Sequence, residues 1–113
     1  MVPLQVDYKN FEDHPDLNPL IEEQVQKLEK YFDRITSCHV VLSKPHNHHN
    51  QGHHYHVHLD VHVPGNTIAI TREPEKNERH EDIEPAIRDA FKTAKRKLQE
   101  YSDRLRSETK RHE

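Results

Sequence analysis

The chain has 113 residues, which is enough for one domain built around a single hydrophobic core. Only 31% of the residues are apolar and 33% are charged, so the sequence predicts a thin core beneath a large solvated surface. No apolar run reaches the roughly 18 residues that cross a bilayer, and the N-terminus lacks a signal-peptide pattern, so we expect a cytoplasmic protein with no membrane partner. The formal net charge of −3, taken alone, argues against a nucleic-acid partner.

The first third of the chain predicts a strand, a helix and a second strand. Residues 2–8 alternate between apolar and polar side chains, which is typical of a half-buried strand. Apolar residues then recur every three or four positions, which predicts a helix over about 17–35 with Asp16 or Asn18 as its cap. Residues 38–43 predict a second strand, parallel to the first because a right-handed crossover joins the two. We expect the lone cysteine, at the start of this strand, to be a buried structural thiol.

The middle of the chain carries the clearest strand signal. Residues 44–52 include proline, asparagine and glycine and no apolar residue, which predicts a loop. Residues 55–63 then alternate strictly between apolar side chains and polar ones, and most of the polar ones are histidines. A turn at residues 64–66 leads into a fourth strand at 67–71.

The last part of the chain predicts one long helix. After a charged linker, apolar residues return at helical spacing, so we expect a helix over about 82–108 with Asp82 as its cap. The predicted order is β-α-β-β-β-α. We therefore predict an α+β two-layer sandwich in which both helices cover one face of a four-stranded mixed sheet, with residues 1–113 forming a single domain. The other face of the sheet meets water and carries the histidines.

Three interpretations of the histidine face stay open. Histidine can be no more than a polar residue that tolerates an open sheet face. It can bind a metal ion, because side chains two apart on a strand are separated by about 7 Å, which two imidazole rings can bridge. It can also contact a polyanion, because protonation near pH 6.5 makes the face cationic. The candidate metal ligands are His54, His56, His58, Asp60 and His62.

Neither metal chemistry nor catalysis has a specific motif to support it. No HExxH or CxxC spacing accompanies the histidines, so we expect no metal and no other cofactor. A histidine base would need a nucleophile or a substrate pocket, and the polar face shows no candidate serine, cysteine or carboxylate pair. We therefore expect no enzymatic activity and no small-molecule substrate.

The second predicted helix is positive in a negative chain. Residues 86–111 contain nine basic and four acidic residues. A helix dipole favours cations near the C-terminus, but this effect fades within about one turn and does not explain a cluster three turns earlier. That cluster is Lys92, Lys95, Arg96 and Lys97. A basic stripe is the electrostatic footprint of nucleic-acid binding, and the end of the first helix can extend it.

The whole chain resembles the short form of the bacterial hibernation-promoting factor family, also called ribosome-associated inhibitor A, protein Y or sigma-factor modulation protein. The resemblance rests on KLEKYFDRI leading into HVVLS, on VHVPG, and on DI followed by AIRDAF, in that order along the chain. It implies the same β-α-β-β-β-α fold, which is similar to a double-stranded-RNA-binding domain. The chain departs from the family in its eight histidines between residues 46 and 62 and in its acidity.

The resemblance implies a protein that binds the small ribosomal subunit in the mRNA and tRNA channel and inhibits translation during stress (ribosome hibernation). It also implies that basic helix faces contact rRNA. At matching positions of this chain those contacts are Lys27, Lys30, Arg34, Arg88, Lys92, Lys95, Arg96 and Lys97. We expect a monomer in solution. Long members of the family pair ribosomes through a second domain that this sequence does not show, so the resemblance does not imply ribosome dimerisation by this protein alone. A metal-buffering module and a transcription-factor modulator stay open as alternatives.

Overall fold

The computed structural model describes residues 2–10, 16–43, 55–72 and 83–111, with only the backbone described for the last four of these. Its elements are β1 (Leu4–Lys9), α1 (Asn18–Tyr31), β2 (Ser37–Ser43), β3 (His56–Val63), β4 (Asn66–Arg72) and α2 (Ile83–Arg111). This confirms the predicted β-α-β-β-β-α order. The expected loop at 44–52, the Asp82 cap and the candidate ligand His54 lie outside the described residues.

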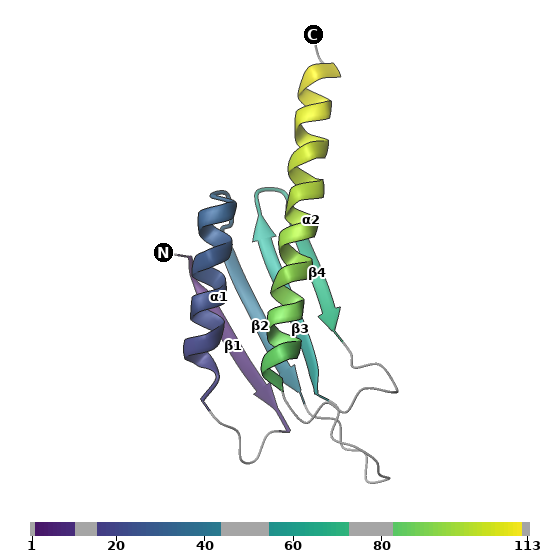
Figure 1. The fold of residues 1–113 in the computed structure, drawn as a ribbon. Coiled ribbons are helices and arrows are strands. Elements are labelled where there is room, and N and C mark those ends of the chain that lie inside the picture. The colour runs from purple at the N-terminus through teal and green to yellow at the C-terminus, as the bar shows by residue number, and fades with distance from the viewer. Residues whose placement is uncertain (1, 11–15, 44–54, 73–82, 112–113) are drawn as a thin grey trace.

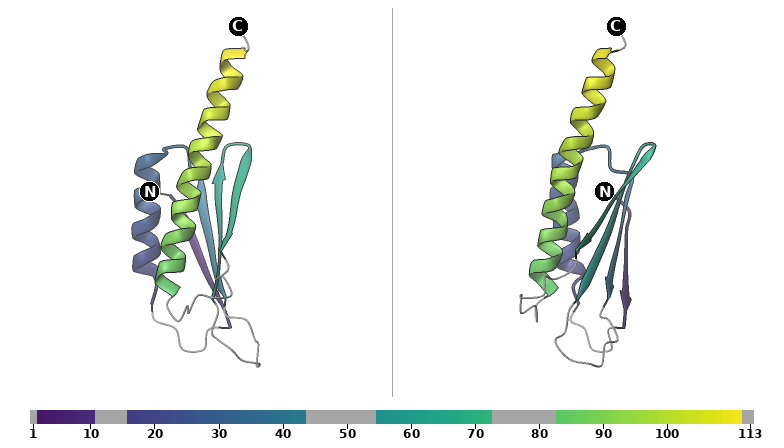
Figure 2. Two further views of the ribbon diagram at one scale, coloured as in Figure 1. Left: turned by 45° about the vertical axis from the view of Figure 1, so that its right-hand side comes forward. Right: turned by 90° about the vertical axis from the view of Figure 1, so that its right-hand side faces the viewer.

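The four strands form one sheet in the order β1-β2-β3-β4. β1 runs parallel to β2, as the crossover through α1 predicts, and the other neighbours are antiparallel. Gly65 makes the β3–β4 turn with a positive φ of 76°, a conformation that glycine adopts without steric cost. Both helices lie on the same side of the sheet, and the opposite side is uncovered (Figures 1 and 2). The predicted α+β sandwich is therefore confirmed.

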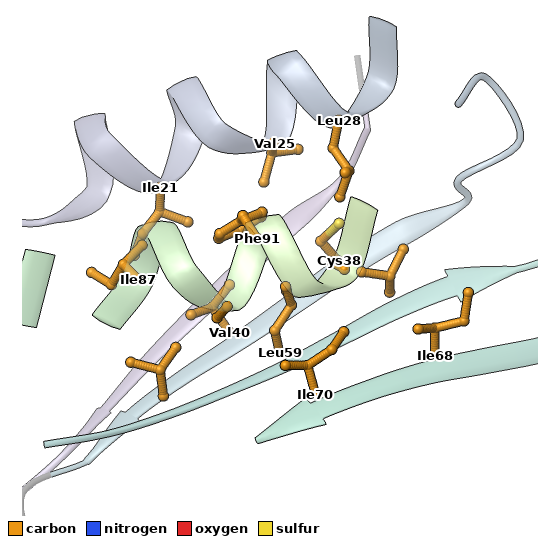
Figure 3. Close-up of a cluster of buried hydrophobic side chains, with 14 of the residues drawn as sticks. Ile21, Val25, Leu28, Cys38, Val40, Leu59, Ile68, Ile70, Ile87 and Phe91 are labelled. Atoms are coloured by element: carbon orange, nitrogen blue, oxygen red, sulfur yellow. The ribbon is translucent and has the colours of Figure 1, made fainter. Parts of the chain in front are cut away.

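The core lies between the sheet and the two helices. Alternate side chains of the strands form the sheet side of this core. The odd residues of β3 and the even residues of β2 and β4 point inward, where Leu59 pairs with Val40 on one side and Ile70 on the other. The helices close this layer with Ile21 and Phe91, among others (Figure 3). Each aliphatic side chain that is fully buried contributes about 1.5–3 kcal/mol. Among the described residues, no polar or charged side chain is buried.

The first helix is shorter than its apolar spacing predicts. It ends at Tyr31, because Phe32 adopts extended backbone angles of φ −139° and ψ 111° while its N–H still donates to the Leu28 carbonyl. A turn then directs Ile35 back into the core, where it is 8% exposed. The prediction that the helix reaches residue 35 is therefore wrong. Phe32 and Ile35 keep helical spacing in the sequence, but they contact the core from the segment that joins α1 to β2.

Asp16 contacts the start of α1, but it is not the N-cap residue that the sequence predicts. The N-cap residue is Leu17, which has no capping side chain, and Pro19 stands in the first turn. The Asp16 carboxylate accepts a hydrogen bond from the backbone N–H of Asn18, at 3.1 Å. One of the free N–H groups at the helix start is thereby satisfied.

The second helix is much longer than the sheet beneath it. At 29 residues it spans about 43 Å, whereas a strand of eight residues spans about 26 Å. Its buried stripe runs from Ile83 to Leu98. Tyr101 then packs edge-on against Phe32, with ring centroids 6.1 Å apart, and donates a hydrogen bond to the Pro64 carbonyl. Beyond this point α2 projects past the sheet (Figure 1) and ends three residues later than predicted.

Cys38 lies in the core on β2 and is 2% exposed, which confirms the structural role expected for it. Burial raises the pKa of its thiol to about 11, and the nearby negative charge of Glu29 acts in the same direction. The thiol is therefore almost entirely protonated at neutral pH, and it is the thiolate that reacts.

Candidate nucleic-acid interface

The eight basic residues predicted to contact RNA all lie on the helical layer or at its end. Seven of them are exposed, and Lys97 is half-buried. Arg34 belongs to the turn after α1 and not to the helix itself. No described helix is apolar enough over a sufficient length to cross a membrane.

Three of the cations form a stripe along the side of α2 that faces α1. Arg88, Lys92 and Lys95 are four and three residues apart, so the helical period places them in one row. The Lys95 Nζ lies 4.7 Å from the centroid of the Tyr31 ring, which belongs to α1. The Tyr31 hydroxyl donates a hydrogen bond to Gln99, the next residue of the same row. These contacts fix the row beside α1.

Lys97 lies on the opposite flank of α2. Asp89 forms an ion pair with Arg72 of β4, at 3.6 Å, so this side of the helix faces the last strand. Lys97 follows Lys95 by two residues, which is about 200° around the helix, and Arg104 follows Lys97 by seven, so Lys97 and Arg104 share a row on the flank away from α1. The structure therefore separates Lys97 from the other predicted contacts. Arg96 lies between the two rows, on the outer side.

Carboxylates on the same helix partner three of the cations. The ion pairs are Lys27 with Glu23 at 3.3 Å, Arg88 with Glu84 at 3.7 Å, and Arg96 with Glu100 at 3.1 Å. Their members are more than half exposed, and an exposed pair of this kind contributes about 0–1 kcal/mol. A phosphate can therefore replace the carboxylate at little cost. The remaining cations of the set form no ion pair with any described residue.

The net negative charge of the chain comes from residues whose side chains the structure does not describe. Those described include twelve Lys or Arg and eleven Asp or Glu, whereas the others hold five and nine. The described body therefore carries a formal charge of +1, although the chain as a whole carries −3. This distribution removes the objection that the overall charge raises against an anionic partner.

A concave surface extends the cationic region beyond the predicted residues. An open cavity of about 680 Å³ lies where the turn after α1 meets α2, and Lys30, Arg34 and Arg106 are among its lining residues. Arg106 was not among the predicted contacts. Its spacing gives the signal, because it follows Gln99 by seven residues and so continues the row of α2 that faces α1.

The histidines of the open sheet face are held by neighbouring strands. On β2, His39 Nε2 lies 2.6 Å from a carboxylate oxygen of Asp7 on β1. On β3, His58 lies 3.0 Å from Asp60 through Nε2 and 2.9 Å from the Thr71 hydroxyl of β4 through Nδ1. A neutral His58 satisfies both contacts when its Nε2–H donates to the carboxylate and Nδ1 accepts from the hydroxyl. His62 similarly contacts the Thr67 hydroxyl at 3.0 Å.

These contacts bear on the metal interpretation. Within the described ranges, no group of three or more His, Cys, Asp or Glu side chains is placed to hold a metal ion. Both ring nitrogens of His58 are already engaged, so coordination there would break a hydrogen bond. The polar interpretation accounts for His39, His58 and His62, while contact with a polyanion stays a prediction.

The Asp7–His39 contact makes a testable prediction about acid sensitivity. Hydrogen bonds from His39 and then from Gln5 lower the pKa of the Asp7 carboxyl below its usual value. Because this pKa is lower in the folded than in the unfolded chain, the stabilisation is present at neutral pH and is lost as the pH falls through the folded value. We expect His39→Ala to return the pKa of Asp7 towards the ordinary range, measured by carboxyl NMR titration. An unchanged Asp7 titration in this variant would show that the contact is not made in solution.

The structure is an open α+β sandwich whose helical layer carries exposed cations. Comparison with known proteins identifies the family: the chain belongs to the family described as sigma 54 modulation protein / S30EA ribosomal protein, whose model matches residues 4–106. No curated protein sequence matches the chain significantly.

Two solved structures share the fold. A ribosomal subunit interface protein from Coxiella burnetii is 19% identical with a TM-score of 0.70, over 90% of this chain and 99% of that one. The N-terminal domain of Thermus thermophilus protein Y is also 19% identical, with a TM-score of 0.67, over 89% of this chain and 99% of that one. At this identity the likeness establishes the fold.

Proposed function

We propose that this protein binds the small ribosomal subunit in the mRNA and tRNA channel and inhibits translation during stress or stationary phase, as a ribosome hibernation factor of the bacterial cytoplasm. The observation that carries the proposal is the family match over residues 4–106, because the description of that family includes a ribosomal protein. The similar fold of the Coxiella protein, a ribosomal subunit interface protein, agrees with it. The protein acts as a monomer and by occupancy, without catalysis.

The physical basis of the proposed binding is contact between helix cations and rRNA phosphates. Double-stranded RNA presents phosphates and 2′-hydroxyls at regular positions, so a rigid surface with matching cations recognises its shape. We place the main contacts on the row of α2 that faces α1 and on the end of α1. The row contributes Arg88, Lys92 and Lys95, the end of α1 and the turn after it contribute Lys27, Lys30 and Arg34, and Arg96 adds a contact from the outer side of α2. Lys97, on the other flank, contributes less in this arrangement.

Salt dependence tests the proposal directly. Each phosphate that a cation neutralises releases bound counterions, so with about six contacts the affinity falls about 10³-fold between 50 and 200 mM salt. We expect the protein to pellet with purified small subunits at the lower salt concentration and to remain in the supernatant at the higher one. Large subunits, sedimented in parallel, are the control for non-specific attraction to RNA. The proposal is wrong if the protein ignores small subunits at 50 mM salt, or binds both subunits equally.

A further inference from the structure

The cavity between the end of α1 and α2 combines the features of a nucleotide site. Its volume of about 680 Å³ lies within the range of sites that hold small ligands. Two segments far apart in sequence form it, residues 30–34 and 102–106. Its α2 residues, Ser102, Leu105 and Arg106, follow the buried stripe of the helix, in the part of α2 that projects past the sheet (Figure 1).

Cations from both segments line the cavity. Lys30 and Arg34 come from the first segment and Arg106 from the second, and all three are exposed. None of them forms an ion pair with a described residue. Asp33 is the one acidic residue among the lining residues, so the local charge favours an anion. Guanidinium groups bind phosphate oxygens through paired N–H donors, and the half-buried Ser102 adds a hydroxyl.

Aromatic rings supply the second part of the site. Tyr31 and Phe32 both line the cavity, and Tyr31 is the most exposed large hydrophobic residue of the described chain, at 39%. Lys95 approaches the Tyr31 ring from a position seven residues before Ser102, about 10 Å back along α2. The cation lies over one face of the Tyr31 ring, so a base that stacks on this ring uses the other face.

We propose that this cavity binds one unpaired RNA nucleotide. The phosphate lies between Arg34 and Arg106, and the base stacks on Tyr31. The proposal rests on the proposed function, because the nucleotide belongs to the rRNA that the helices contact. Duplex RNA keeps its bases inside the helix, so only a looped-out or single-stranded nucleotide fits. Stacking on an aromatic side chain contributes about 1–3 kcal/mol per base, and it accepts any of the four bases.

The test measures binding of hexauridylate and hexaadenylate to the purified protein at 50 mM salt, with ultraviolet cross-linking and peptide mapping. We expect adducts on Tyr31 or Phe32, and no adducts with a duplex of the same length. Arg106→Ala should weaken hexamer binding about tenfold, whereas Arg104→Ala, an exposed arginine on the opposite flank of α2, should leave it unchanged. Tyr31→Leu should weaken binding about tenfold through lost stacking, and Tyr31→Phe should restore it.

The outcomes separate this proposal from the proposed function. If small subunits bind the protein tightly but no adduct forms in residues 30–34 or 102–106, the cavity proposal is overturned and the function stands. If hexamers cross-link to Tyr31 while small subunits do not bind, the proposed function is overturned and the proposal that the cavity binds a nucleotide stands. Adenosine monophosphate is tested alongside, and an affinity equal to that of the hexamer would overturn the RNA assignment in favour of a free nucleotide.

Discussion

Replacing Lys92 and Lys95 together by glutamate is expected to weaken binding to the small subunit by about 100-fold or more. Both side chains are exposed, and they occupy the middle of the row of α2 that faces α1. Reversal removes two favourable contacts and places two carboxylates against phosphates, and like charges brought together at an interface cost several kcal/mol. The slope of log affinity against log salt should also fall by about two. Co-sedimentation across a salt series measures both effects.

The matched control is Lys97→Glu with Arg104→Glu. It changes the net charge by the same amount on the same helix, but on the flank away from α1. We expect this variant to lose less than about tenfold in affinity, because its charges act only through the screened long-range field. Equal losses in the two variants would show that net charge, and not the face beside α1, governs binding. Thermal unfolding of each variant checks that Lys95→Glu, which removes the cation from the Tyr31 ring, leaves the fold intact.

Leu59→Ala is expected to lower the free energy of unfolding by about 2–5 kcal/mol, a large part of the roughly 5–15 kcal/mol typical of a domain. Leu59 is fully buried in the central strand β3, with Val40 and Ile70 as its cross-strand neighbours. Truncation there leaves a cavity that flanking strands cannot collapse to fill. Urea denaturation followed by circular dichroism measures the change.

Leu4→Ala is the matched control for this loss. Leu4 is half-buried on the edge strand β1, so the same change of side chain removes less buried surface and leaves an opening that water can enter. We expect a loss of about 1 kcal/mol. If both variants lost the same amount, the core would not be centred on β3 as the structure places it.

Periodicity predicts the elements of this protein well and their ends less well. The alternation in β3 and the apolar stripe of α2 each extend over many residues, so both patterns are recognised even where single positions depart from them. The predicted end of α1 is wrong because Phe32 and Ile35 keep helical spacing after the helix has stopped. Ile35 reaches the core from the turn after α1, so apolar spacing alone does not mark the end of the helix.

The candidate interface, too, is only partly predicted by the sequence. The sequence indicates that cations concentrate on the helices, but counting charges does not separate the two flanks of α2. The contacts of Tyr31 with Lys95 and of Arg72 with Asp89 make that distinction. The cavity beside Arg106 depends on the turn after α1, whose position no helical pattern specifies.

The projecting end of α2 has a consequence for how tightly the protein holds its partner. Past Tyr101 only Ser102 and Leu105 among the described side chains are partly shielded from solvent, so the last turns depend on their own backbone bonds. A helix end of this kind frays, and its amide protons exchange with solvent much faster than those beside the sheet. If a ligand seated near Arg106 orders these turns, part of the binding free energy is spent on that ordering, and the affinity falls accordingly.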